Sequence, residues 1–550
     1  MKKILYKAIC IASLIGLTAC EKTFDELASN PNQQDVNGFY NTPQNINKGV
    51  IGIYAYITTP RAMGTAGRLQ INRGDESSDA SDYGVPGQYS ANLSSSWYTI
   101  VQPYSLFYTA ASQACQMIEE IPKVNFSNQQ LKNAYLGEAY FLRAYTHWFL
   151  FLNFRNIPLM KELPSSAKDY KPQATPEEAW DFIISDLKRA KELLPEKGFW
   201  TGESVGRVTK GSAIALLGKA YLYRSGIEHY YGHSNTTYYN EAAAEFNELI
   251  LSGKYRLVAD YNDNFKVATE NNDESIFELQ FLGDVTNTGF NPGLSNSGVW
   301  RDPRGYLPPT NKNANSSVIH DWVYNTFVNS KDASGHTDPR MFGTLIFDDT
   351  KSEINARTGD EVRIFDNKTF REYYGVKGFG VAKAQAKKYK AACRKGIDWT
   401  LATRNPGDNF YMWNGRANGL NQTEIRYADV LLMYAEAVVK GGTQGSLTAL
   451  DAVNQVRARV GMPAVSSVDM DVIEHERILE LTQEGHRFFD LLRWGKVAQR
   501  FHELERTDPN FKKYSNSAYL GFQENKNEWL PLPVDEVEGN PHITRNNPGW

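Results

Sequence analysis

Acidic, basic and imidazole side chains crowd one predicted helix, about 471–493, near the end of the 550-residue chain. They are Glu476, Arg477, Glu480, Glu484, His486, Arg487, Asp490 and Arg493. Glu484 and His486 would suit general acid–base catalysis, but residues two apart on a helix point in different directions. We therefore predict that these charges form an ion-pair network that docks the helix. Glu138 and Arg143, in an apolar helix, are likewise predicted to be paired buried charges.

The sequence lacks the short motifs that would place a metal ion or a phosphate. His475-Glu476 and His502-Glu503 are not followed by the second histidine of a zinc-binding HExxH motif. Asp260-x-Asn262-x-Asn264 imitates the start of a calcium loop, but the turn glycine and the closing glutamate are missing. We therefore predict no catalytic residue, no metal and no cofactor. Two carboxylates that converge only in the folded chain could still make a glycosidase, which stays open as a minor alternative.

The elements that must position these residues are mainly helical. Helices are predicted over 131–152, 175–195, 207–225, 238–252, 425–440, 447–459 and 471–493. The first of them is apolar on nearly every side and should be central and buried. The paired spacing is close to that of a tetratricopeptide-like hairpin, which repeats every ~34 residues. The segments 72–96 and 260–420 are rich in Gly, Asn, Asp and aromatic residues and are predicted to be surface loops, with a short strand at 275–281.

The first twenty residues are typical of a lipoprotein signal peptide. Three lysines precede an apolar stretch over 8–17, which is too short to span a bilayer. It ends in Leu17-Thr18-Ala19-Cys20, which predicts removal of residues 1–19, lipidation of Cys20 and a polar tether over 20–44. Cys115 and Cys393 are predicted to be buried thiols.

Composition narrows the class of protein further. Hydrophobic residues make up 41% of the chain, which excludes a wholly disordered chain. The formal net charge is -4, so nucleic acid is not the expected partner. Aromatic residues reach 13%, led by 31 Tyr, which suits recognition through flat, half-polar rings.

A series of short motifs runs along the chain in a specific order. They include Gly137-Glu138-Ala139-Tyr140-Phe141-Leu142-Arg143-Ala144, Glu424-Ile425-Arg426-Tyr427-Ala428-Asp429, Asn454-Gln455-Val456-Arg457, Glu484-Gly485-His486-Arg487-Phe488-Phe489-Asp490-Leu491 and Pro531-Leu532-Pro533. Together they resemble the SusD/RagB family of outer-membrane nutrient-binding lipoproteins. The ending Asn547-Pro548-Gly549-Trp550 also fits, although Asn546 stands where glutamine is usual and Trp550 where Tyr is common.

The resemblance implies a non-enzymatic lipoprotein, exposed at the surface of the outer membrane. It implies an oligosaccharide or polysaccharide ligand and a SusC-like TonB-dependent transporter as partner. It also implies a body over 45–550 with a tetratricopeptide-like scaffold at about 100–260 and 421–500, and a loop-rich ligand face at about 72–98 and 260–420. A peptide-binding homologue is the alternative function, and a surface glycoside hydrolase is the minor one.

A sugar ligand would need an aromatic platform rimmed by hydrogen-bonding side chains. Two segments, 73–98 and 297–310, have this composition, and the family places its ligand face on loops from roughly these portions. The predicted ligand-binding residues are Tyr83, Tyr89, Trp97, Trp300, Arg301, Tyr306 and Trp413. A tryptophan that anchors its own loop is the alternative interpretation for Trp97 and Trp300.

Overall fold

The structure is a computed structural model of the chain, and it describes most of the residues. The described residues are 36–59, 62–79, 89, 93–166, 169–281, 317–347, 363–365, 368–369, 391–396, 398, 419–508, 511 and 520–550. Within them, no helix combines the length and the apolar character that crossing a membrane requires.

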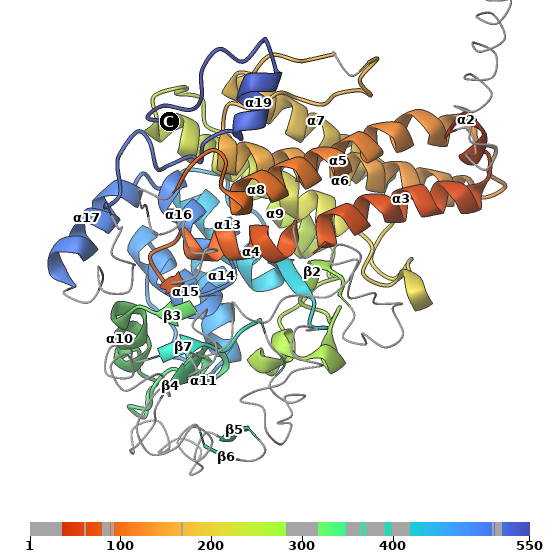
Figure 1. Ribbon diagram of the computed structural model, residues 1–550. Helices are drawn as coiled ribbons and strands as arrows, with labels where there is room; N and C mark the ends of the chain where they lie inside the picture. The colour runs from red at the N-terminus through yellow and green to blue at the C-terminus, as the bar shows by residue number, and fades with distance from the viewer. Residues whose placement is uncertain are drawn as a thin grey trace, which may run out of the picture.

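The scaffold is a row of helices packed side by side (Figure 1). Its members are α3 (Pro43–Thr58), α5 (Tyr98–Glu120), α6 (Gln129–Phe154), α7 (Pro176–Leu193), α8 (Lys210–Tyr230), α9 (Tyr239–Leu251), α13 (Tyr427–Val439) and α14 (Ala449–Arg459). From α5 to α9 each helix packs against the next, and α9 then packs against α13, which packs against α14. This arrangement confirms the predicted mainly helical, tetratricopeptide-like scaffold. Neither α3 nor α5 is among the predicted helices; the two pack on each other and on α6.

Local sequence signals set where these helices begin. The Thr175 hydroxyl accepts a hydrogen bond from the Glu178 N–H (3.2 Å), and the Glu178 carboxylate accepts one from the Thr175 N–H (2.8 Å). This capping box starts α7 where its sequence predicts. Pro43 follows the N-cap Thr42, so α3 begins inside the segment 20–44 that was predicted to be a tether. α6 is buried on nearly every side, as predicted.

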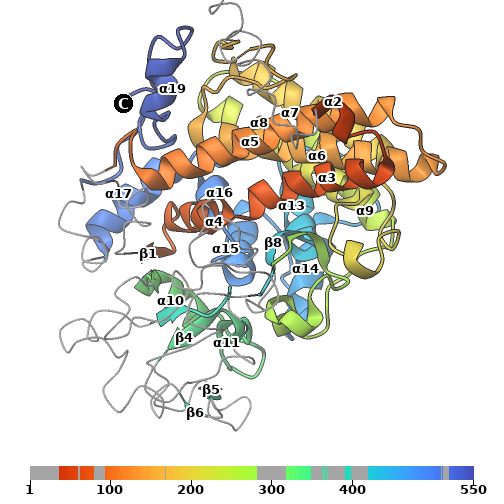
Figure 2. The ribbon, with the colours of Figure 1, turned by 45° about the vertical axis from the view of Figure 1, so that its right-hand side comes forward.

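The remaining elements form a smaller, loop-rich part that lies at one end of the molecule. Figure 2 shows α10, α11 and β4 grouped there, away from α5 and α7. Its short helices are α10 (Asp321–Asn329) and α11 (Arg340–Thr344), with the 3-10 helices η4 (Tyr261–Phe265) and η5 (Val267–Thr269). An antiparallel sheet has the order β1 (Ser77–Asp79), β3 (Ser317–Ile319), β7 (Ala391–Cys393) and β4 (Leu345–Phe347). A separate ribbon pairs β2 (Ser275–Leu279) with β8 (Gln422–Arg426), and β5 (Arg363–Phe365) pairs with β6 (Lys368–Thr369).

Further helices connect the two parts and the chain ends. They are α2 (Val36–Phe39), α4 (Met63–Asn72), η2 (Ile121–Lys123), η3 (Gly202–Ser204), α15 (Met470–Leu481), α16 (Arg487–Arg493), α17 (Val497–Thr507) and α19 (Val534–Gly539). Cys115 and Cys393 are both buried thiols, as predicted.

The predicted long helix over 471–493 is wrong, because the chain breaks it into α15 and α16. Gln483 and Gly485 have φ angles of 68° and 84°, in the left-handed region that ends a helix. The Thr482 hydroxyl also donates to the Ile478 carbonyl (2.6 Å), which satisfies one acceptor of the last turn. The predicted start of the 425–440 helix is wrong as well, since Ile425 and Arg426 belong to β8.

The beginning of the predicted surface loop at 72–96 is instead buried. Arg73 and Asp75 are completely buried, and Glu76 is nearly so. The Arg73 guanidinium donates to the Asn153 side chain (3.1 Å) and to the Glu528 carbonyl (2.7 Å). These partners bind both terminal nitrogens of the buried cation, so a polar segment that composition assigns to the surface lies inside the fold.

Candidate functional site

A network of buried ion pairs joins the scaffold to the loop-rich part. Among the described residues it links the acids Glu274, Asp338, Glu476, Glu480 and Glu484 to the bases Arg340, Lys395, Arg426, Arg457 and Arg459. Five charges of each sign therefore balance in a region that excludes water. The predicted ion-pair network is confirmed.

The other predicted charges are paired too. Arg477 contacts Asp429 (2.8 Å) and Asp490 (2.7 Å), and Arg493 contacts Glu436 (2.5 Å). In the scaffold, Glu138 pairs with Arg207 (2.7 Å) and Arg143 with Asp186 (2.8 Å). These charges therefore hold helices together.

Glu484 and His486 do not form an acid–base pair. Burial alone would raise the pKa of Glu484, but the guanidinium of Arg426 (2.7 Å) and the ammonium of Lys395 (2.7 Å) outweigh it and lower that pKa to about 2. Burial and the nearby Lys219 ammonium lower the pKa of His486 to about 4. A carboxylate that stays ionised and an imidazole that stays neutral are poorly matched to proton transfer near pH 7.

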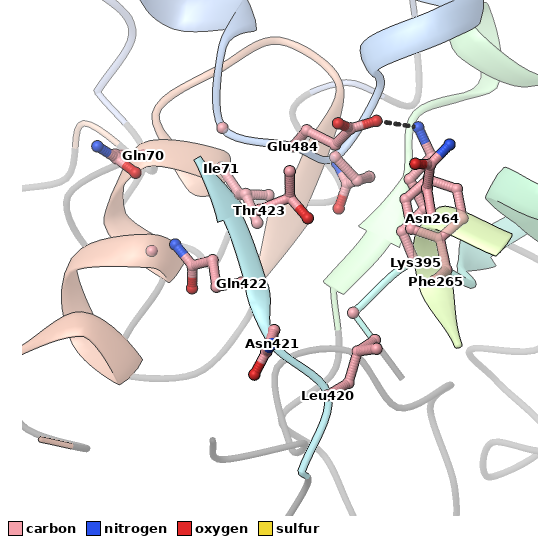
Figure 3. A pocket seen from close by; sticks show the side chains of 14 residues that line it. Gln70, Ile71, Asn264, Phe265, Lys395, Leu420, Asn421, Gln422, Thr423 and Glu484 are labelled. Atoms are coloured by element: carbon pink, nitrogen blue, oxygen red, sulfur yellow. Dashed lines mark hydrogen bonds and ion pairs between the residues drawn. The ribbon is translucent and has the colours of Figure 1, made fainter. Parts of the chain in front are cut away.

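A small cavity of about 40 Å³ lies beside Glu484 and Lys395 of this network (Figure 3). It is lined by Gly67, Gln70, Ile71, Asn264, Phe265, Lys395, Gly396, Leu420, Asn421, Gln422, Thr423, Gln483, Glu484 and Gly485. These residues come from α4, η4, β8, the turn between α15 and α16, and the chain after β7. We call this space the carboxamide cavity, because five of its lining side chains are Asn or Gln.

The charges of the carboxamide cavity are already neutralised within the protein. Figure 3 shows the Glu484 carboxylate joined to the Lys395 ammonium, and Arg426 holds the other carboxylate oxygen. The uncharged part of the lining consists of the carboxamides, several of which already bond within the protein, the hydroxyl of Thr423 and the half-buried ring of Phe265. Carboxamides both donate and accept, so this lining suits a polyhydroxylated, uncharged ligand.

Gln483 supplies the clearest sign that the cavity receives a partner. Its amide nitrogen donates to the Ser77 hydroxyl (2.9 Å), but its buried Oε1 finds no donor among the described residues. Its φ of 68° is rare for a residue other than glycine. A buried acceptor without a donor costs free energy, and such groups and such backbone strain concentrate at functional sites.

One end of the β2–β8 ribbon lies at this cavity. Leu279 pairs with Gln422 across the β2–β8 ribbon, and the Phe281 N–H donates to the Asn421 side chain (2.8 Å). Phe281 and Asn421 therefore lie side by side. Asp79 likewise pairs with Ser317. Asn421 and Gln422 line the carboxamide cavity, so this end of the β2–β8 ribbon borders it.

The structure describes only two of the predicted ligand residues, Tyr89 and Trp97. Tyr83, Trp300, Arg301, Tyr306, Trp413 and the predicted lipidation site Cys20 lie outside the described residues. Tyr89 is a core residue, since it is 3% exposed and its ring packs edge-on against Phe501 and Phe522. Its hydroxyl donates to the Arg73 carbonyl (2.8 Å), so its ring has no open face for a ligand. Trp97 is half-buried at the start of α5 and does not line the carboxamide cavity.

The calcium-like motif serves a local structural role. The Asp260 carboxylate accepts from the Asn262 N–H (2.9 Å) and contacts the Lys266 ammonium (3.3 Å), which caps η4. The Asn264 amide donates to the Tyr261 carbonyl (3.2 Å). Within the described part of the chain, no group of His, Cys, Asp and Glu side chains could hold a metal ion.

Comparison with known proteins places the chain in a family. The model of the SusD family matches residues 273–550, and a model described as starch-binding, associating with the outer membrane, matches residues 26–222. The chain belongs to the SusD family. A SusD-like protein P2 of Formosa agariphila is 25% identical over the full length of both chains. A SusD-like protein of Bacteroides ovatus is 24% identical over 78% of this chain and 72% of its own.

Solved structures of SusD proteins share the fold. The crystal structure of a SusD superfamily protein from Bacteroides vulgatus has a TM-score of 0.70 and 24% identity, and it covers 92% of this chain and 99% of its own. Surface glycan-binding protein A from Bacteroides thetaiotaomicron, in complex with laminarihexaose, has a TM-score of 0.67 and 18% identity, with coverage of 92% and 99%.

Proposed function

We propose that this SusD-family protein is a surface-exposed lipoprotein, anchored to the outer membrane at Cys20, which binds a glycan without cleaving it. We further propose that it delivers this ligand to a SusC-like TonB-dependent transporter. Glycan binding by relatives, including the laminarihexaose complex of the Bacteroides thetaiotaomicron protein, supports the ligand class.

The observation that carries the proposal is Gln483: the residue lines a cavity whose charges are already paired, and its buried Oε1 has no donor among the described residues. We propose that a sugar hydroxyl entering the cavity donates to this oxygen and that the carboxamide atoms not yet bonded within the protein bind further hydroxyls. We propose that Trp300, Arg301, Tyr306 and Trp413, which lie outside the described residues, supply the aromatic platform.

Binding to a panel of polysaccharides, measured by retardation in polysaccharide-containing gels, tests the ligand class. Gln483→Met keeps the side-chain length but removes the acceptor, together with the hydrogen bond that the amide donates to Ser77, so thermal unfolding must first show that the variant is folded. We expect it to weaken retention by about fivefold, the worth of roughly one hydrogen bond to the ligand. Gln523→Met, at an exposed carboxamide, is the matched control and should behave as wild type. Retention of Gln483→Met equal to wild type would show that the glycan binds elsewhere.

The same preparations separate the alternative functions. Chromatography of the glycan after incubation would reveal shorter products if the protein were a hydrolase, and we expect the glycan to be recovered intact. Calorimetry with peptide pools should give no heat if the ligand is a glycan. Heat with peptides, and no retention by any polysaccharide, would favour the peptide-binding homologue.

For the transporter, we propose a docking face on α3 and α5. Between Pro43 and Thr58 the only charged residue is Lys48, and Tyr98–Ile118 contains none, although 22% of the chain is charged. Ile51 and Tyr56 of α3 are 48% and 38% exposed. Depletion of charge with exposed apolar and aromatic side chains is typical of the centre of protein interfaces. A lipid anchor would hold both proteins at one membrane and raise their effective concentration, so a modest interface would suffice.

A further inference from the structure

A second hollow, which we call the Trp200 groove, lies beside the β2–β8 ribbon and has a volume of about 210 Å³. It is lined by Lys197, Gly198, Trp200, Val205, Gly206, Arg207, Thr209, Tyr255, Asn271, Ser275, Ile276 and Glu278. Its walls come from the loop that joins α7 to α8, from the chain after α9 and from β2. This volume is below the roughly 300–1,000 Å³ of pockets that bury a drug-sized ligand, so the groove would take a small group such as a single sugar ring.

Trp200 is held as a rigid, half-buried ring in this groove. Its indole N–H donates to the Val208 carbonyl (3.0 Å), so the polar atom of the ring is satisfied without a ligand. The Arg207 guanidinium lies 4.5 Å from the ring centre, and Tyr135 is stacked with Trp200 at an interplanar angle of 11°. Arg207 is itself fixed by two hydrogen bonds of 2.8 and 2.7 Å to the buried Glu138.

The polar rim of the Trp200 groove contains both signs of charge, each engaged with the protein. The Lys197 ammonium donates to the carbonyls of Asn272 (2.8 Å) and Ser275 (3.4 Å). The Glu278 carboxylate accepts from the Asn271 N–H (3.2 Å). A rigid aromatic ring beside amide, hydroxyl and carboxylate groups matches the apolar face and the hydroxyl edge of a sugar ring.

The Trp200 groove and the carboxamide cavity share a wall. The Asn421 side chain, which lines the cavity, donates directly to the Glu278 carboxylate (3.1 Å), which lines the groove. The same Asn421 amide also donates to Gln280 (2.9 Å), and Gln280 exchanges two hydrogen bonds with Asn271 of the groove. One layer of hydrogen-bonded side chains therefore separates the two spaces.

We infer that the Trp200 groove is a second glycan-binding site, in which a sugar ring packs beside Trp200 and its hydroxyls bond to Asn271 and Glu278. This inference rests on the proposed function, because the groove would take the same polysaccharide as the carboxamide cavity. Two sites on one protein that bind one polysaccharide reinforce each other through effective concentration.

The test uses the polysaccharide that retains the wild-type protein and two variants of the groove. Trp200→Ala removes the ring. Val205→Arg fills the groove from a residue that is 46% exposed, so it leaves the core intact. Tyr170→Ala, at an exposed aromatic residue that does not line the groove, is the matched control. Thermal unfolding checks that each variant is folded.

We expect both groove variants to lose retention by at least about fivefold while Tyr170→Ala is unchanged. In calorimetry with an oligosaccharide of that polysaccharide, the wild-type chain should bind two molecules and Val205→Arg one. If a polysaccharide retains the wild type but the folded Val205→Arg variant matches it in retention and stoichiometry, the groove is not a glycan site and the proposed function stands. If no polysaccharide retains the wild type, the proposed function itself fails.

Discussion

Arg426 is the residue whose removal should most damage the junction between the scaffold and the loop-rich part. Its guanidinium is 1% exposed and contacts Glu274 (2.6 Å), Glu480 (2.5 Å) and Glu484 (2.7 Å). Replacing it by methionine in Arg426→Met keeps much of the volume but leaves the buried network with one excess negative charge.

The expected loss of stability depends on which cations each carboxylate still contacts after Arg426 is removed. Without Arg426, Glu274 and Glu480 keep Arg459, and Glu484 keeps Lys395. Every acid therefore still has one cation, so the loss should be that of about one broken buried pair, about 3–5 kcal/mol, and not three times that value. Arg426→Met should lower the free energy of unfolding by this amount in urea denaturation monitored by circular dichroism.

Two further variants sharpen this measurement. Arg189→Met breaks an ion pair with Glu192 at a similar distance (2.6 Å), but both side chains are about half exposed, so it should cost less than about 1 kcal/mol. Adding Glu484→Gln to Arg426→Met removes the excess charge and should recover part of the loss, with a coupling energy of about 0.5–3 kcal/mol. A loss below about 1 kcal/mol for Arg426→Met, equal to that of Arg189→Met, would refute the reasoning from burial.

Other perturbations probe the pH response, the partner and the anchor. Burial lowers the pKa of His147 from 6.5 to about 4, so its stabilising contribution should be complete above pH 6.5 and fall progressively between about pH 6.5 and 4. His147→Gln should flatten that part of the stability curve, and an unchanged slope would contradict the assignment. Ile51→Asp with Tyr56→Asp should abolish co-purification with the SusC-like transporter while polysaccharide retention stays at the wild-type level; loss of retention alone would mean that the two faces are wrongly assigned. Cys20→Ala should release the protein from the membrane fraction, and unchanged fractionation and surface protease sensitivity would disprove the lipid anchor.

The sequence was sufficient wherever a local rule decides the outcome. The capping box at Thr175 starts α7 at the predicted place, and the unbroken apolar pattern of 131–152 makes α6 central. Glu476 and Glu480 were predicted to belong to an ion-pair network, and they do, but their partners Arg340, Arg426, Arg457 and Arg459 come from other elements and not from the predicted helix. The short motifs around these residues also sufficed to suggest the SusD family. Each motif is a run of neighbouring residues, so it can be recognised without the tertiary structure.

Only the tertiary structure decided which polar segments are buried and which distant side chains come into contact. Arg73 and Asp75 were assigned to a surface loop by composition, but partners far away in the chain hold them in the interior: Arg73 donates to the Glu528 carbonyl, and Asp75 pairs with Arg487. Tyr89 was taken for a ligand residue for the same reason and is a core residue. The carboxamide cavity combines Gln70, Asn421 and Gln483, which no spacing rule connects. A binding site assembled from distant segments leaves no period in the sequence, because its geometry is set by how the helices and the β2–β8 ribbon pack and not by neighbouring residues.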